Sequence, residues 1–137
     1  MDKLVLDNVS KYNSSKEMLK NENIDLISIL TPSGLHLNNF IEINKDIKNF
    51  LIEKPIVTSI KDAQDIIKIA NNNNNKVFVV LQNRFNKPIL KLKEMLVNNK
   101  LGRVFLVSVK VRWSRDEKYY NQAKWRGTKN LDGGILF

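Results

Sequence analysis

Cysteine is absent from this sequence of 137 residues, which excludes disulfide bonds. An apolar run of about 18 residues, the length that a membrane-spanning helix needs, is also missing. No basic-then-apolar leader of the secretory kind is present. We therefore expect a cytoplasmic protein with no membrane partner and no bound metal.

Acidic residues are the scarcer charge, since 14 Asp and Glu face 23 Lys and Arg, for a formal net charge of +9. Cations clustered in such numbers would indicate a partner rich in phosphate, such as a nucleic acid. Here they are scattered, and only the stretch 103–126 mixes them with aromatic residues. Scattered charge serves solubility and steering more than a specific partner, so nucleic-acid binding is not expected.

Strand and helix patterns alternate through the first part of the chain. Three short segments are largely apolar, as in strands covered on both faces of a parallel sheet: 24–30, 49–55 and 76–82. Apolar residues at helical spacing follow the first two: Leu37, Phe40, Ile41 and Ile47, then Ile60, Ala63, Ile67 and Ala70. Residues typical of helix caps are Ser14 with Glu17 and Ser59 with Asp62, and the asparagine run 71–75 ends the second pattern. The sequence predicts an α/β fold with βαβ crossovers and a doubly wound parallel sheet.

The pattern changes near Arg84. Pro88 indicates the start of a further helix and Gly102 its end. Within the segment 103–113, residues 107–113 alternate strictly between apolar and polar, which predicts a half-exposed antiparallel strand. We therefore place a domain boundary here, with residues 1–84 in the parallel α/β domain and residues 85–137 at the start of an α+β domain with an antiparallel sheet.

Two polar clusters lie where predicted parallel strands end. They are the segment 31–36, which reads TPSGLH, and the triplet Glu53, Lys54 and Pro55. Ligands bind in the crevice beyond the carboxyl ends of such strands, so the clusters should face each other across one crevice, where Lys54 is a candidate for moving a proton. A solvated Glu53–Lys54 pair followed by a simple turn at Pro55 is the alternative interpretation.

These two clusters resemble motifs of the glucose-fructose oxidoreductase and inositol dehydrogenase family of nicotinamide-dependent sugar dehydrogenases. Three further segments, QNRFN at 82–86, WRGT at 125–128 and DGG at 132–134, are similar to the bacterial UDP-N-acetylglucosamine and UDP-N-acetylglucosaminuronate 3-dehydrogenases of surface-polysaccharide synthesis. The resemblance covers nearly the whole chain. It implies that the first domain is Rossmann-like, that NAD or NADP is the cofactor, and that the enzyme is a homo-oligomer acting on a nucleotide sugar.

The resemblance also implies roles for individual residues. Lys54 matches the active-site lysine, and the residues beside the cofactor are Thr31, Pro32, His36, Glu53 and Pro55. The residues facing the sugar or its diphosphate are Asn83, Arg126 and Thr128. A satisfied histidine at a helix start is the alternative for His36, and a core aromatic is the alternative for Trp125. The resemblance further implies a cis Lys54–Pro55 bond, against a prior of about 5% for bonds before proline.

Two departures from the family pattern concern groups that the chemistry needs. None of the five glycines forms the glycine-rich turn that seats a pyrophosphate, and the acidic residue that grips the ribose is missing with it. The family's second active-site group, a histidine after the DGG segment, has no match. We therefore expect the middle part of a dehydrogenase, cut at both ends. The alternatives are a non-catalytic truncated product, a fragment that depends on a partner, or a basic module for phosphate-rich ligands.

The missing turn leads to a prediction for the isolated chain. Without a pyrophosphate cradle at a helix N-terminus, its dissociation constant for NAD should be weaker than about 1 mM, or less than roughly 4 kcal/mol of binding. Calorimetric titration of the purified chain with NAD measures it. Micromolar binding would contradict the expectation.

Overall fold

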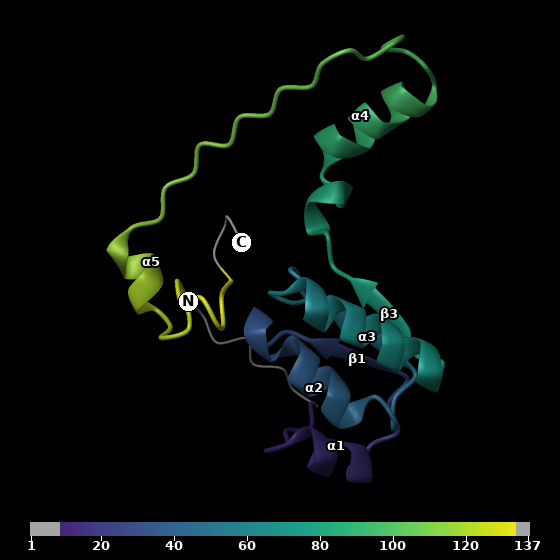
Figure 1. Ribbon diagram of the computed structural model, residues 1–137, viewed down its shortest axis with the longest axis vertical. Helices are drawn as coiled ribbons and strands as arrows, with labels where there is room; N and C mark the ends of the chain where they lie inside the picture. The colour runs from purple at the N-terminus through teal and green to yellow at the C-terminus, as the bar shows by residue number, and fades with distance from the viewer. Residues whose placement is uncertain (1–8, 134–137) are drawn as a thin grey trace.

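A parallel sheet of three strands organises the part of the chain that the computed structural model describes, residues 9–133 (Figure 1). The strands are β1 (Leu26–Ile29), β2 (Asn49–Ile52) and β3 (Lys76–Val79), in the order β1-β2-β3. The three strands are paired without an offset, since Ile27 lies opposite Phe50 and Phe50 lies opposite Val77. The predicted α/β fold with a parallel sheet is confirmed.

Five helices lie in residues 9–133, and two of them, α1 and α3, begin at the serine caps predicted from the sequence. Their bounds are α1 (Ser15–Asn21), α2 (His36–Ile43), α3 (Ile60–Asn73), α4 (Lys87–Val97) and α5 (Glu117–Asn121), with short 3-10 turns η1 (Ser33–Leu35) before α2 and η2 (Gln82–Phe85) before α4. Ser14 Oγ accepts the N–H of Glu17 at 3.1 Å, and Ser59 Oγ accepts the N–H of Asp62 at 3.1 Å. Each cap satisfies an N–H that the first helical turn leaves without a partner.

The core lies between one face of the sheet and the helices α2 and α3. Phe40 of α2 and Phe50 of β2 are fully buried and meet edge to face, with ring centroids 4.8 Å apart. Ile52 and Ile66 complete the most deeply buried apolar set. Because aromatic pairs and branched side chains remove the most apolar area from water here, this layer carries most of the hydrophobic stabilisation.

The other face of the sheet is open in the described residues. Leu26 of β1 and Phe78 of β3 are 51% and 55% exposed, so the expectation that both faces are covered was wrong. A doubly wound sheet needs a helix layer on each side, and α2 and α3 supply only one. The predicted core face of α3 is confirmed for Ala70, which is buried, and for Ala63, which packs against the core. It was wrong for Ile60 and Ile67, which are exposed, and it missed the buried Ile66.

Three asparagines close the sheet at the end where its strands begin. Asn44, which is 4% exposed, accepts a hydrogen bond from the side-chain amide of Asn73. The Asn75 amide donates to the carbonyl oxygens of Asn44 and Ile47, each at 2.8 Å. The predicted end of α3 inside the asparagine run is confirmed, with Asn74 in the left-handed conformation at φ 53° as its C-cap.

The chain beyond β3 leaves the sheet, and α4 and the segment after it project away from the core (Figure 1). Residues 103–113 are extended and exposed, but no strand pairs with them among residues 9–133. The predicted antiparallel strand is therefore absent, because a strand needs a hydrogen-bonded partner and alternation alone does not provide one. Gly102 does not end α4 either, since the helix stops at Val97 with Asn98 as its cap.

The exposed apolar side chains of this segment generate a prediction. The 137-residue chain should self-associate through Val109 and its neighbours, since Val109 is 78% exposed in a segment with unpaired backbone groups. Val109→Lys should weaken association by about tenfold, the worth of roughly 1.5 kcal/mol of lost valine burial. Ser108→Lys, on the opposite face, is the matched control and should change little. Sedimentation velocity over a concentration series decides, and a chain that stays monomeric throughout contradicts the prediction.

Candidate active site

Two loops leave the sheet side by side where β1 and β2 end. Residues 30–35 follow β1 and residues 53–57 follow β2. The ladder continues one step past the strands, because the N–H of Glu53 donates to the carbonyl of Ile29 at 3.0 Å. The two polar clusters singled out in the sequence are therefore neighbours at the carboxyl edge of the sheet, where open parallel sheets bind their ligands.

His36 ties these two loops together. It is the first residue of α2, and its side chain is 1% exposed. Its Nε2 lies 2.8 Å from the carbonyl oxygen of Thr31, and its Nδ1 lies 3.1 Å from the carbonyl oxygens of Pro55 and Ile56. Both ring nitrogens thus face backbone carbonyls at a helix start, and the nitrogen that carries the proton donates to the carbonyls on its side.

Lys54 lines a cavity at the carboxyl ends of β2 and β3. The cavity measures about 370 Å³, and its other lining residues are Leu81, Gln82, Asn83 and Arg84, mostly from turn η2. The Lys54–Pro55 bond is cis, as expected from the sequence. No carboxylate among residues 9–133 forms an ion pair with Lys54 or Arg84. Cationic and amide groups therefore surround the cavity without an acid to neutralise them.

The other residues expected beside a cofactor lie along the two loops. The Thr31 hydroxyl donates to Asn39 Oδ1 at 2.6 Å, which holds this side chain against α2. Pro32 precedes turn η1, and Glu53 is half-buried one residue before Lys54. The carboxyl edge thus carries Thr31, Pro32, Glu53 and Pro55 on two loops that His36 holds together.

The segment 125–133 folds into a loop that docks on the turn after β1. Within it, the Thr128 hydroxyl donates to the carbonyl of Trp125 at 2.6 Å, and the N–H of Gly127 donates to Asp132 Oδ2 at 2.6 Å. The docking bond runs from the N–H of Gly34 to the carbonyl of Leu131, at 3.0 Å. A Cβ added at Gly34 would lie 1.9 Å from the carbonyl oxygen of Asn130, so this approach requires glycine.

A stack of guanidinium and aromatic groups adjoins the docked loop. The guanidinium carbons of Arg115 and Arg126 lie 4.0 and 4.1 Å from the centre of the Tyr119 ring. Arg126 Nη1 also donates to the carbonyl of Tyr119 and to Gln122 Oε1, while its buried Nε has no protein partner. Cations held by aromatic faces and neutral oxygens keep their charge available for an anionic ligand.

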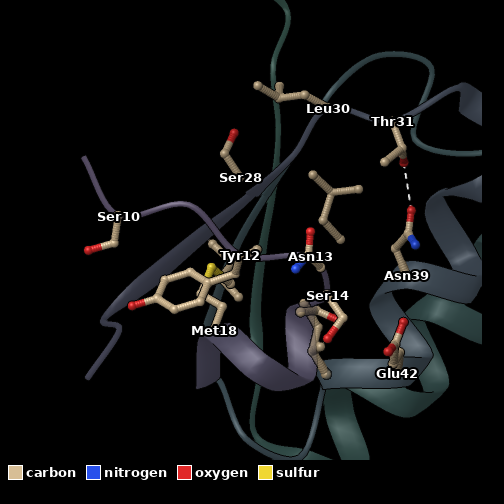
Figure 2. Close-up of a pocket in the computed structure, with 14 residues that line it drawn as sticks. Ser10, Tyr12, Asn13, Ser14, Met18, Ser28, Leu30, Thr31, Asn39 and Glu42 are labelled. Atoms are coloured by element: carbon tan, nitrogen blue, oxygen red, sulfur yellow. Dashed lines mark hydrogen bonds between the residues drawn. The ribbon is translucent and has the colours of Figure 1, made fainter. Parts of the chain in front are cut away.

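A larger cavity of about 600 Å³ runs along the free edge of β1 (Figure 2). Figure 2 places Tyr12, Ser28 and Asn39 around it, from the segment before α1, from β1 and from α2. The Tyr12 hydroxyl donates to the Glu22 carboxylate, which raises the pKa of Tyr12 and lowers that of Glu22. Because β1 pairs with β2 on one side only, this cavity adjoins unpaired backbone of β1. Its lining contains no Lys or Arg, unlike that of the smaller cavity.

The structure brings together some of the predicted residues and separates others. Lys54 and Asn83 share the 370 Å³ cavity, whereas Arg126 and Thr128 do not line it. Sequence reasoning missed Gln82 and Arg84, although both belong to the QNRFN motif around Asn83. It also quoted Gly34 within TPSGLH without a role, because a docking partner about 100 residues away leaves no trace in local spacing.

Within 9–133, no three side chains of His, Cys, Asp or Glu gather as ligands of a metal would. No helix in that range has both the length and the apolar character to cross a membrane.

Comparison with known proteins places the chain among oxidoreductases. Residues 5–81 match the family described as oxidoreductases with an NAD-binding Rossmann fold. The solved WlbA dehydrogenase of Chromobacterium violaceum, in complex with NADH and UDP-GlcNAcA, is 36% identical, with a TM-score of 0.81 over 88% of this chain and 35% of that one. For the WlbA dehydrogenase of Bordetella pertussis, in complex with the same two molecules, the identity is 34%, the TM-score 0.80 and the shares 87% and 36%.

Curated relatives extend the likeness. Oxidoreductase P35 of Formosa agariphila is 26% identical over 90% of this chain, which corresponds to 39% of that protein. The chain therefore spans between about a third and two fifths of the length of these proteins.

The close approach at Gly34 generates a prediction. Gly34→Ala should undock the loop 125–133 by overpacking, at a cost of about 1–3 kcal/mol, and speed amide exchange of Gly127 and Asp132 by roughly 5- to 150-fold. Ser33→Ala, one residue earlier in the same turn, is the control. Hydrogen exchange followed by NMR measures both variants. Unchanged exchange in Gly34→Ala would show that the loop does not depend on this contact.

Proposed function

The chain belongs to the glucose-fructose oxidoreductase and inositol dehydrogenase family of NAD-binding oxidoreductases, and we propose that it supplies the catalytic lysine and part of the sugar site of a nucleotide-sugar dehydrogenase. The observation that carries this proposal is the position of Lys54, at the carboxyl edge of the sheet in a cavity that also holds Asn83. Without a partner carboxylate among the described residues, its amino group is available to a substrate hydroxyl.

The reaction proposed is oxidation of a sugar hydroxyl to a ketone. Lys54 takes the hydroxyl proton, and the C–H bond of the same carbon supplies a hydride. Bound NAD supplies the hydride acceptor. Asn83 and Gln82 orient the sugar by hydrogen bonds, and the walls of the cavity hold the reacting carbon in place, which is where much of the acceleration arises.

The residues present fit one end of the cofactor. The loops that carry Thr31, Pro32, Glu53 and Pro55 leave the carboxyl edge of the sheet on either side of His36 and would hold the nicotinamide end. The pyrophosphate end lacks its cradle in this chain, since no glycine-rich turn opens a helix in residues 9–133. NAD is favoured because the two WlbA dehydrogenases were crystallised with NADH, and NADP stays open.

The proposed substrate is a UDP-N-acetylhexosamine or its uronate, oxidised at C3 in surface-polysaccharide synthesis. UDP-GlcNAcA bound to both WlbA dehydrogenases supports this class. Arg126, whose guanidinium is stacked on Tyr119, would meet the diphosphate, and Thr128 would line the approach. We further propose that residues 1–84 and 85–137 belong to different domains of a cytoplasmic homo-oligomer.

The test uses a chimera, because the chain spans about a third of its solved neighbours. Residues 1–137 replace the matching segment of the Chromobacterium violaceum dehydrogenase, and NADH formation is measured with UDP-GlcNAcA. Lys54→Ala should lower kcat by roughly 10² to 10⁴, the usual worth of a placed base, while NADH binding persists. Lys54→Arg should not restore turnover, because a guanidinium hardly ever gives up its proton.

Lys61→Ala removes an exposed lysine of α3 and is the matched control, with turnover expected to be unchanged. Near-normal turnover in Lys54→Ala would overturn the role of Lys54. A chimera that binds NADH and yet oxidises no sugar would favour the alternative of a non-catalytic fragment.

A further inference from the structure

The environment of the His36 ring is unusual in its composition. All three polar atoms that its nitrogens face are backbone carbonyl oxygens, those of Thr31, Pro55 and Ile56. Carbonyl oxygens only accept, so a ring nitrogen bonds to them only when it carries a proton: a proton on Nδ1 serves Pro55 and Ile56, and a proton on Nε2 serves Thr31. Only 1% of the His36 surface is exposed, so water has little access to these contacts.

The same contacts fix the turn that carries Lys54. Before Lys54, the N–H of Glu53 is held by the carbonyl of Ile29. After it, the carbonyls of Pro55 and Ile56 lie against His36 Nδ1. Lys54 therefore sits between two anchors, one from the sheet and one from a side chain of α2.

The second anchor is itself rigidly held. His36 is in the helix whose Phe40 and Ile43 are buried in the core, so the ring is fixed relative to the sheet. Neither ring nitrogen faces a space where a ligand could bind, because both already face protein atoms. A group in this position acts on chemistry only through the residues it holds.

We propose that His36 is a positioning residue that sets the place of Lys54 in its cavity by holding the carbonyls of Pro55 and Ile56. This inference rests on the catalytic role proposed for Lys54. Loss of the imidazole removes the side chain that the carbonyls of Pro55 and Ile56 face and releases one end of the turn. A displacement of about 1 Å at a reacting group is enough to cost roughly 10²-fold in rate.

Two near-isosteric variants separate the two sides of the ring. The amide nitrogen of Asn in His36→Asn takes the place of Nδ1 and keeps a donor toward Pro55 and Ile56. The amide nitrogen of Gln in His36→Gln takes the place of Nε2 and keeps a donor toward Thr31. Each variant loses the hydrogen-bond donor on one side of the ring. A purely structural role of His36 therefore predicts similar losses of stability and of activity for both variants.

The first measurement uses the 137-residue chain, whose single histidine gives one set of ring signals in NMR with ¹⁵N-labelled histidine. A ring N–H proton protected from exchange with water is expected. In His36→Asn the carbonyl ¹³C shifts of Pro55 and Ile56 should stay near their original values, and in His36→Gln they should move. An unprotected ring proton, or shifts that move equally in both variants, would overturn the proposal.

The second measurement is kinetic and uses the chimera. His36→Gln should lower kcat by roughly 10- to 100-fold with KM for the sugar little changed, whereas His36→Asn should stay within about threefold of the parent. Equal kcat values for the two variants, or values that follow Tm, contradict a positioning role. If Lys54→Ala itself turns over normally, it is the proposed function that fails; if Lys54→Ala is inactive and the two His36 variants behave alike, only the positioning role fails.

Discussion

The parallel pairing of the three strands without an offset is the constraint on which the candidate site depends. Because Ile29 pairs with Ile52 and Ile52 with Val79, the three strands end at the same level. The loops that follow them must therefore leave the sheet at one edge. This geometry, and no interaction between the loops themselves, first brings Lys54 beside turn η2 and His36 within reach of Pro55.

The same pairing accounts for the surfaces that the described residues leave uncovered. A sheet in this order has a free edge at β1, next to the 600 Å³ cavity, and an uncovered face at Leu26 and Phe78. The chain spans about a third of the length of its solved neighbours. Open edges and apolar faces are costly in water, so they are expected to pair with further protein.

The sequence predicted what depends on local pattern and missed what depends on distant partners. Strands, caps and the Lys54 turn follow from apolar runs, serine spacing and a short motif, each confined to a few residues. The core face of α3 did not, because Ile66 and Ile67 are equally apolar and only the sheet decides which is buried. The segment 103–113 shows the opposite limit: a clean alternation gives no strand where no partner lies beside it.

Polar side chains secure the sheet at both ends, and the two ends differ in what they permit. Where β2 begins, Asn75 donates to the carbonyls of Asn44 and Ile47, so the asparagine run 71–75 provides specific hydrogen bonds. Where β2 ends, His36 does the same for the carbonyls of Pro55 and Ile56. In both places a side chain satisfies backbone groups that the strands cannot reach. At the beginning of the strands the result is a closed end. At their carboxyl ends the ring contacts the turn whose lysine lines an open cavity, and a group that transfers a proton needs such access to its substrate.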